Sequence, residues 1–195
     1  MTAAAAAIGR PGRQRSAAAD AAILDATLAL LRDRGYEALT MAAVIEKAGV
    51  SSATLYRRWT AKSELVAAAV ASLVPDEPAE IDTGSLEDDV AAFVREVAGA
   101  IKARGHMAEL LGHDKKDPEL TAALRSKLLT PRVRTLQRIL DRAAERRELG
   151  TPTTAETLLP LVVGPLHYRA TVLDEPLSPA FLRRVVQATV AGLRG

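Results

Sequence analysis

Residues 51–59 place hydroxyl, phenol and guanidinium groups on one side of a predicted short helix. Ser51 can cap this helix, and Leu55 and Trp59, four residues apart, form its apolar back. The opposite side carries small, hydroxylated and basic residues, namely Ser52, Ala53, Tyr56 and Arg57. Small residues let the backbone approach a partner closely, while phenol and guanidinium groups reach phosphates and base edges. This surface therefore suits the major groove of DNA.

A second predicted helix and a tight turn precede this surface. Thr40 can cap a helix that carries Met41 and Val44 among its apolar residues. Gly49 follows where a left-handed residue can end that helix and allow a turn of three or four residues. The two helices and their turn indicate a helix-turn-helix unit. Another helix, predicted for residues 16–34 and ended by Gly35, completes a three-helix domain.

The same stretch resembles the DNA-binding domain of the TetR family of bacterial repressors, over about residues 16–70. The matching residues are, in order, Arg34-Gly35-Tyr36, Thr40, Ala48-Gly49-Val50-Ser51, Thr54-Leu55-Tyr56-Arg57, Trp59, Lys62 and Leu65. Two places depart from the family pattern, because Ile45 replaces a small alanine and Thr60-Ala61 replaces Pro-Ser. We therefore expect less close helix packing at Ile45, and we expect Thr60 to cap the following helix.

The resemblance also implies which residues contact DNA. Lys62 looks like the family's phosphate-binding lysine, and the alternative is that its ammonium group is simply exposed. The complete predicted set is Thr40, Ser51, Ser52, Ala53, Thr54, Tyr56, Arg57, Arg58 and Lys62. Within this set, Ser52, Ala53 and Arg57 are the candidates for base edges.

The composition is typical of a helical protein without cysteine. Of the 195 residues, 48% are apolar and 3% aromatic, which favours helices over sheets because alanine is abundant. The net charge of +2 is too small to identify a nucleic-acid binder, but residues 1–60 carry a net charge of +3. Residues 75–90 carry seven acidic groups and no basic group. A DNA-facing end followed by an acidic junction would have this distribution. The absence of cysteine excludes disulfides and Cys-type zinc sites.

We predict an all-α fold of about nine helices in two parts. Residues 1–15 are interpreted as a flexible basic arm, and Arg10, Arg13 and Arg15 either reach the minor groove or phosphates or remain in a solvated tail. Residues 16–74 form the DNA-binding domain with a connecting fourth helix. Pro75 and Pro78 mark a linker. Residues 85–195 form a helical domain that opens with a capping box at residues 85–88.

The resemblance implies that this second domain encloses a small-molecule pocket. Thr130-Pro131 should bend one helical tract, and Pro160 and Pro165 should distort an apolar helix over about residues 153–173. Such irregularities prevent perfect packing and favour a cavity for an apolar or amphipathic ligand. The candidate lining residues are Phe93, Val97, Ile101, Met107, Leu110, Leu111, Leu128, Leu159, Val163, Leu166, His167 and Tyr168. His167 either orients a ligand or is a core histidine bonded to a carbonyl group.

The last helix, predicted to begin at Ser178-Pro179, carries two adjacent apolar rows. Because one packing contact needs only one row, the second row suggests a further partner such as a symmetry mate. The resemblance implies a four-helix bundle built from the last two helices of two subunits. The predicted interface residues are Leu161, Phe181, Leu182, Val185, Val186, Thr189 and Val190. The alternative is that all of them are buried within one subunit.

The three histidines raise the question of a metal site. His106 and His113, with Asp114 and Asp117 nearby, could share a helix face, but they do not form a standard ligand motif. We therefore expect no metal and no cofactor. The chain also lacks a nucleophile elbow, a phosphate-binding glycine loop and a dinucleotide fingerprint, so we expect no enzyme activity.

These observations predict a homodimeric transcriptional repressor that binds a palindromic operator in double-stranded DNA and leaves it when a small molecule binds. The alternatives are a DNA-binding dimer without an effector and, from another class, an enzyme built on a helical bundle. The N-terminus lacks the apolar core of a signal peptide. The longest uncharged apolar run, residues 157–168, is too short to cross a bilayer. We expect a cytoplasmic protein that does not associate with membranes.

Overall fold

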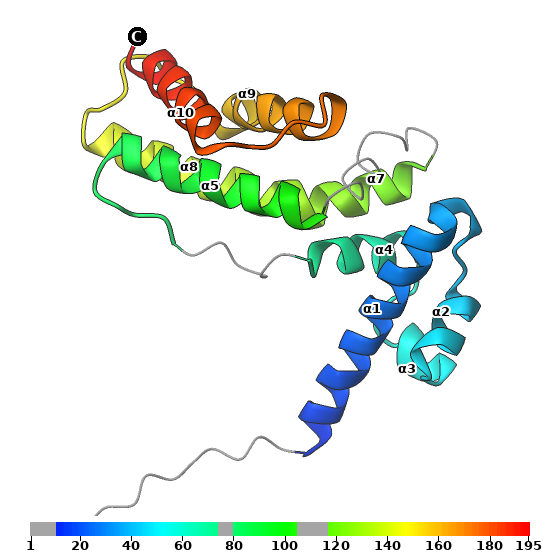
Figure 1. Cartoon of the computed structure of the whole chain (residues 1–195). Helices are drawn as coiled ribbons and strands as arrows, with labels where there is room; N and C mark the ends of the chain where they lie inside the picture. Colours follow the sequence, from blue (N-terminus) through cyan, green and yellow to red (C-terminus); the bar gives the residue numbers. More distant parts are fainter. Residues whose placement is uncertain (1–10, 74–79, 105–116) are drawn as a thin grey trace, which may run out of the picture. The chain divides into compact units, whose positions relative to one another are not determined.

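The computed structural model of the chain describes residues 11–73, 80–104 and 117–195. Over these residues the secondary structure is helical and contains no strand, which confirms the predicted all-α class. The chain divides into two compact units, Met1–Ala69 and Val70–Gly195. The boundary between them falls inside helix α4 (Lys62–Ala71) (Figure 1). The predicted linker prolines, Pro75 and Pro78, lie outside the described residues.

The first unit contains α1 (Pro11–Ala38), α2 (Met41–Ala48), α3 (Ser52–Tyr56) and most of α4. Helix α1 begins at Pro11, before its predicted start at residue 16, so the end of the predicted arm is helical. Gly35 has a φ of 73° and interrupts the helical conformation where the sequence predicts the end of this helix. The inner side of α1 is apolar, with Ile23, Leu28, Leu30 and Leu31 buried.

Polar caps fix the ends of α2 and α3 where the sequence predicts them. The hydroxyl of Thr40 accepts a hydrogen bond from Ala43 N at 3.2 Å, and that of Ser51 accepts one from Thr54 N at 3.2 Å. Gly49 adopts the left-handed conformation, with a φ of 65° and a ψ of 32°. These local interactions set the turn that orients α3.

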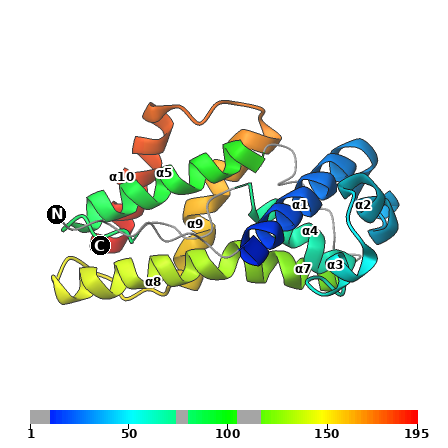
Figure 2. The same ribbon diagram turned by 90° about the horizontal axis from the view of Figure 1, so that it is seen from below.

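The second unit contains α5 (Leu86–Arg104), α7 (Pro118–Leu124), α8 (Thr130–Glu145), α9 (Ala155–His167) and α10 (Pro179–Arg194). Helix α5 contacts α8, α9 and α10, and α9 also contacts α8 and α10. In the view of Figure 2, α9 runs across the directions of α5 and α8. The side chains between these helices form the core, which includes Leu86, Phe93, Val94, Leu136, Ile139, Leu158, Val162, Leu166, Val186 and Val190.

Two π-helical segments, η2 (Arg125–Leu129) and η3 (Tyr168–Val172), interrupt the regular helices of this unit. Pro131 has no N–H, and its ring crowds the carbonyl group four residues earlier. The turn before it widens, and Thr130 N donates to Arg125 O across five residues. Pro160 and Pro165 lie inside α9, and η3 follows that helix directly. The irregularity predicted at Pro131 therefore takes the form of a wider turn, whereas α9 continues as an α-helix through Pro160 and Pro165 and the wider turn comes after it.

One carboxylate of the acidic junction at residues 75–90, that of Asp89, is buried. The hydroxyl of Ser85 accepts a hydrogen bond from Asp88 N at 3.2 Å, which confirms the predicted cap. Asp89 is completely buried, and its carboxylate accepts hydrogen bonds from Thr83 N at 2.7 Å and from Thr83 Oγ1 at 2.8 Å. Its other oxygen accepts one from Arg146 Nη2 at 3.0 Å. One of the acidic groups of the junction thus holds the start of α5 against the end of α8.

Candidate functional site

Helix α3 turns a short polar edge toward solvent. Ser52, Ala53, Tyr56 and Arg57 are exposed, and Tyr56 retains 49% of its accessible surface. Leu55 is completely buried and Trp59 is half-buried, so both hold the helix from behind. This arrangement of exposed and buried residues agrees with the helix face predicted from the sequence. The exposed edge carries a hydroxyl, a phenol and a guanidinium group without a bulky apolar side chain between them.

The predicted contacts at the ends of α2 and α3 combine exposure with a structural role. Thr40 and Ser51 are exposed, and both hydroxyls accept the capping hydrogen bonds described above. Thr54 is half-buried, and its hydroxyl lies 2.9 Å from that of Ser51. These hydroxyl groups therefore fix the backbone at the start of the exposed edge.

Two predicted phosphate ligands have partners inside the first unit. Arg58 Nε forms an ion pair with Asp20 of α1, and Arg58 Nη1 donates to Thr54 O at 3.4 Å. Lys62 Nζ donates to Tyr36 O at 3.1 Å and lies 4.2 Å from the centre of the Tyr36 ring. Both cations therefore tie α3 and α4 to α1. Sequence reasoning did not identify Asp20 as a partner, because no local spacing links it to Arg58.

Thr60 bonds to the first turn of α4 through Glu64. The carboxylate of Glu64 accepts hydrogen bonds from Thr60 N at 3.3 Å and from Thr60 Oγ1 at 3.2 Å. The Glu64 side chain thus reaches back to Thr60, which precedes α4, much as the glutamate of a capping box reaches back to the start of its helix. Thr60 is therefore joined to the helix start, but its hydroxyl donates instead of accepting and α4 begins two residues later, so the prediction that Thr60 caps this helix is wrong.

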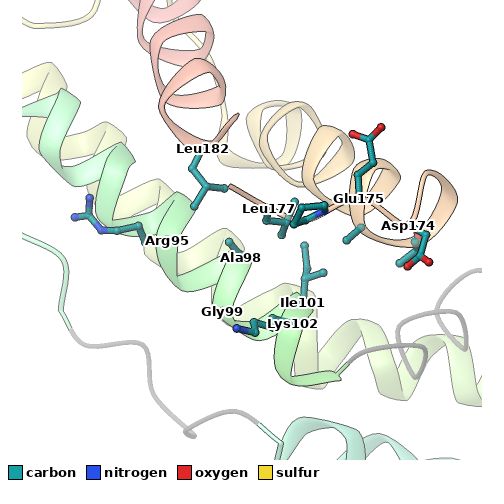
Figure 3. A pocket seen from close by; sticks show the side chains of 12 residues that line it. Arg95, Ala98, Gly99, Ile101, Lys102, Asp174, Glu175, Leu177 and Leu182 are labelled. Carbon is teal, nitrogen blue, oxygen red and sulfur yellow. The ribbon is translucent and has the colours of Figure 1, made fainter. Parts of the chain in front are cut away.

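A pocket of about 650 Å³ lies in the second unit, between the C-terminal half of α5 and the segment that connects α9 to α10 (Figure 3). Its walls comprise Arg95, Ala98, Gly99, Ile101, Lys102, Ala170, Thr171, Asp174, Glu175, Pro176, Leu177 and Leu182. Ile101, Leu177 and Leu182 gather at its centre in Figure 3. Glu175 pairs with Arg169 at 2.6 Å, and the Arg169 guanidinium group lies 4.6 Å from the centre of the Phe181 ring. An apolar interior with charged groups at its border suits an apolar or amphipathic molecule.

The walls of this pocket differ from the predicted lining set, of which they include Ile101. Phe93, Val97, Leu159 and Leu166 belong to the core, and Val163 packs against it. Leu128 is also buried, His167 is half-buried, and Tyr168 retains 56% of its accessible surface. Met107, Leu110 and Leu111 lie outside the described residues. Most of the wall comes from small and charged residues, which gave no pattern in the sequence.

A second concavity, a groove of about 440 Å³, runs between α9 and α10. Leu161, Val185 and Thr189 of the predicted interface set line it, and Leu161 retains 65% of its accessible surface. Most of the predicted interface residues of α10 pack inward, because Val185, Val186 and Val190 are in the core and Phe181 and Leu182 pack against it.

Several residues named from the sequence lie outside the described ranges. These are Arg10 of the predicted arm and the possible metal ligands His106, His113 and Asp114. Among the residues that the structure describes, no three histidine or acidic side chains gather as a metal site would require. No helix in the described ranges is both long and apolar enough to cross a membrane.

Comparisons with known proteins agree with this geometry. Residues 80–189 match the family model described as tetracyclin repressor-like, C-terminal domain, and residues 23–69 match bacterial regulatory proteins, tetR family. The DNA-binding transcriptional repressor TetR of Mycobacteroides abscessus is 33% identical over 179 residues, which cover 90% of this chain and 91% of that protein. The uncharacterized HTH-type transcriptional regulator YdeS of Bacillus subtilis is 27% identical over 185 residues, covering 94% and 93%.

A solved structure gives the same result for the fold. The TetR family transcription regulator SCO0332 superposes with a TM-score of 0.65 at 27% identity, covering 89% of this chain and 97% of that one. The matched families and relatives are transcription regulators and not enzymes. The resemblance seen in the sequence is thus confirmed, and the chain belongs to the TetR family of bacterial DNA-binding transcriptional regulators.

Proposed function

We propose that the protein is a homodimeric repressor whose two α3 helices read the half-sites of a palindromic operator. A small apolar or amphipathic molecule then releases it from DNA. The observation that carries this proposal is the exposed edge of Ser52, Ala53, Tyr56 and Arg57 on a helix held by buried Leu55. The relative of 33% identity is named a repressor, which supports repression over activation.

In this proposal, some residues of the exposed edge contact base edges and others contact phosphates. Ser52, Ala53 and Arg57 face base edges, because small residues allow close approach and a guanidinium group can bind guanine with two hydrogen bonds. Tyr56 and Thr40 contact phosphates and set the register of the helix on the duplex. Arg58 and Lys62 anchor α3 and α4 through Asp20 and Tyr36, and in this proposal they also contact phosphates.

Dimerisation is supported by the groove between α9 and α10. Leu161 is large and apolar yet retains 65% of its accessible surface, and it adjoins Val185 and Thr189 in the groove wall. A large apolar side chain as exposed as that of Leu161, set in the wall of a groove between two helices, is typical of a surface that a partner covers. A symmetric partner presents the same two helices, so the contact closes as a dimer with two-fold symmetry.

An effector is supported by the pocket beside α5. Its volume of about 650 Å³ falls within the usual range for small-molecule sites, roughly 300–1,000 Å³. A bound effector releases DNA only if it binds the DNA-free conformation more tightly than the DNA-bound one. The proposed change is a different separation of the two α3 helices from the roughly 34–36 Å of one DNA turn. Helix α4 continues through the boundary between the two units, which provides a covalent route for that change.

Selection of bound DNA from a random pool tests the DNA-reading part of the proposal. The wild-type protein should enrich a palindromic sequence whose half-sites are about one helical turn apart. The double variant Y56A/R57A, carried through the same rounds, should enrich none. Enrichment of a site without two-fold symmetry, or equal enrichment by the double variant, would contradict the proposed reading mode.

A second experiment separates the repressor from an effector-independent dimer. Apolar and amphipathic compounds are screened for release of the selected DNA, measured by fluorescence anisotropy. The variant I101W fills the pocket and should retain DNA binding while losing the response to an active compound. A response that persists in I101W would show that the effector does not bind in this pocket. A screen without any active compound would favour the alternative of an effector-independent regulator.

A further inference from the structure

Two arginines are almost completely buried in the second unit. Arg132, in the first turn of α8, retains 8% of its accessible surface, and Arg104, the last residue of α5, retains 9%. Arg132 Nη1 donates to Leu128 O at 2.7 Å, and Arg104 Nε donates to Val70 O at 3.4 Å, with Val70 in the same unit. Arginine is almost never buried to this extent unless its charge is paired.

The positive charges of these two side chains are not matched by carboxylates in contact with them. Burial, together with a smaller contribution from the repulsion of Arg132, lowers the pKa of Arg104 to about 10, so the charge of Arg132 acts on Arg104. Burial also lowers the pKa of Arg132, against the attraction of Glu96. The pKa of Glu96 is itself raised by burial, despite the opposing effect of Arg132. Among the described residues, no ion pair joins a carboxylate to either arginine.

Arg132 also has a donor that the protein does not use. Its Nε atom is buried and has no hydrogen-bond acceptor within the part of the chain that the structure describes. A buried N–H of a charged group without an acceptor costs free energy, so its persistence in a folded protein needs a reason. The arginine pair has an excess of positive charge and an unused donor, and an oxygen atom that carries negative charge would satisfy both.

We propose that Arg104 and Arg132 form an anion-binding site that takes a carboxylate or phosphate group. The planar guanidinium group presents two parallel N–H donors that match the oxygens of either group. The anion accepts from Arg132 Nε and screens the repulsion between the two arginines. Neither arginine lies in the walls of the pocket beside α5, so this site is separate from the proposed effector site. The inference does not depend on DNA binding or on an effector.

Thermal unfolding of the full chain in defined salts tests this site. Sodium chloride is replaced stepwise by sodium acetate or by sodium phosphate at constant ionic strength and pH, and Tm is measured by calorimetry. At least one of the two anions should raise the Tm of the wild-type protein along a saturating curve. The expected rise is about 2–4 °C at roughly five times the Kd. A response to acetate identifies a carboxylate site, and a response to phosphate identifies a phosphate site.

Variants at residue 132 decide whether such a response comes from the arginine pair. R132M removes the positive charge and all N–H donors of the guanidinium group, so the anion-dependent rise in Tm should disappear. R134M removes an exposed arginine from the same helix and should keep the wild-type response. If R132M does not fold, R132K provides the test, because a single ammonium group cannot form the paired hydrogen bonds and should weaken the apparent affinity at least tenfold. A rise of equal size in the residue-132 variants, or no response of the wild-type protein to either anion, would overturn the proposal.

Discussion

Asp89 Oδ2 and Arg146 Nη2 lie 3.0 Å apart, and this ion pair joins α5 to the residue that ends α8. Asp89 is completely buried, while Arg146 also pairs with Glu148 at 2.8 Å. Glu148 in turn accepts a hydrogen bond from Leu86 N at the start of α5. The contact therefore closes one end of the helical bundle with groups that lie about 60 residues apart in the chain.

We expect D89A to destabilise the second unit strongly. The substitution removes a buried carboxylate and the three hydrogen bonds that it accepts from Thr83 N, Thr83 Oγ1 and Arg146 Nη2, at a cost of about 3 kcal/mol in the free energy of unfolding. Denaturant unfolding followed by circular dichroism measures this loss. D82A is the matched control, because Asp82 is half exposed and lies 3.8 Å from Arg146, so its removal should change the stability little. Equal effects of the two variants would show that burial of Asp89 does not matter.

The same carboxylate should make stability depend on pH in acid. Burial alone raises the pKa of Asp89, but hydrogen bonds from Thr83 and Arg146 and the charge of Arg146 outweigh it, so the pKa lies below its ordinary value of 3.8. In the acidic window between the folded and the ordinary pKa, the unfolded chain binds more protons, so stability rises with pH. The contribution is complete above the ordinary pKa and is lost as pH falls through the folded value. The Tm difference between wild type and D89N, measured by calorimetry, should therefore shrink as pH falls below about 4. A constant difference would contradict a lowered pKa.

Substitution of Arg57 should weaken DNA binding without affecting the fold. If Arg57 binds a base edge, R57A should cost about 1–3 kcal/mol on the selected sequence and relax the preference at one base position. Y56A removes an uncharged phosphate contact instead, so it should weaken binding to all sequences and leave the salt slope unchanged. Fluorescence anisotropy at several salt concentrations measures both effects. R134A, an exposed arginine of the second unit, is the control. Unchanged affinity for DNA in both R57A and Y56A would show that α3 does not contact DNA.

Asp20 and Arg58 allow a test of whether an arginine anchors α3 or binds phosphate. D20N removes the charge of the partner but leaves the Arg58 guanidinium group available. It should lower the Tm while DNA affinity stays within about a factor of two, since a phosphate contact by Arg58 would remain. R58A removes both roles and should lower Tm and DNA affinity together. Should R58A change Tm alone, Arg58 is an anchor and not a DNA ligand.

Leu161 offers a direct test of the proposed dimer surface. L161E places a charge in the centre of the groove between α9 and α10 and should convert a dimer into monomers, because a buried unpaired carboxylate is costly. Sedimentation equilibrium at several protein concentrations measures the change. V172E is the matched control, since Val172 is exposed to a similar extent, at 62% against 65%, and lies outside the groove walls. Dimers that persist in L161E would contradict this interface.

Local chemistry in the sequence is enough to predict the helix-turn-helix. The caps at Thr40 and Ser51 and the left-handed glycine at Gly49 act over three or four residues, and each forms in the structure as predicted. The spacing of Leu55 and Tyr56 on a short helix likewise predicts which side is buried and which is exposed. These features depend on hydrogen bonds and helix periodicity between near neighbours, so the order of residues alone determines them.

Only the tertiary structure decides which distant residues meet. It pairs Arg58 with Asp20 and Lys62 with Tyr36, and it builds the pocket from α5 and the segment that leads into α10. It also buries Arg104 and Arg132 as neighbours although they lie on different helices. Long-range contacts depend on how helices pack against one another, and the spacing of apolar residues along the sequence does not predict that packing. The sequence therefore determines the exposed polar edge of α3, whereas the pocket walls and the buried charges follow from the three-dimensional arrangement of the helices.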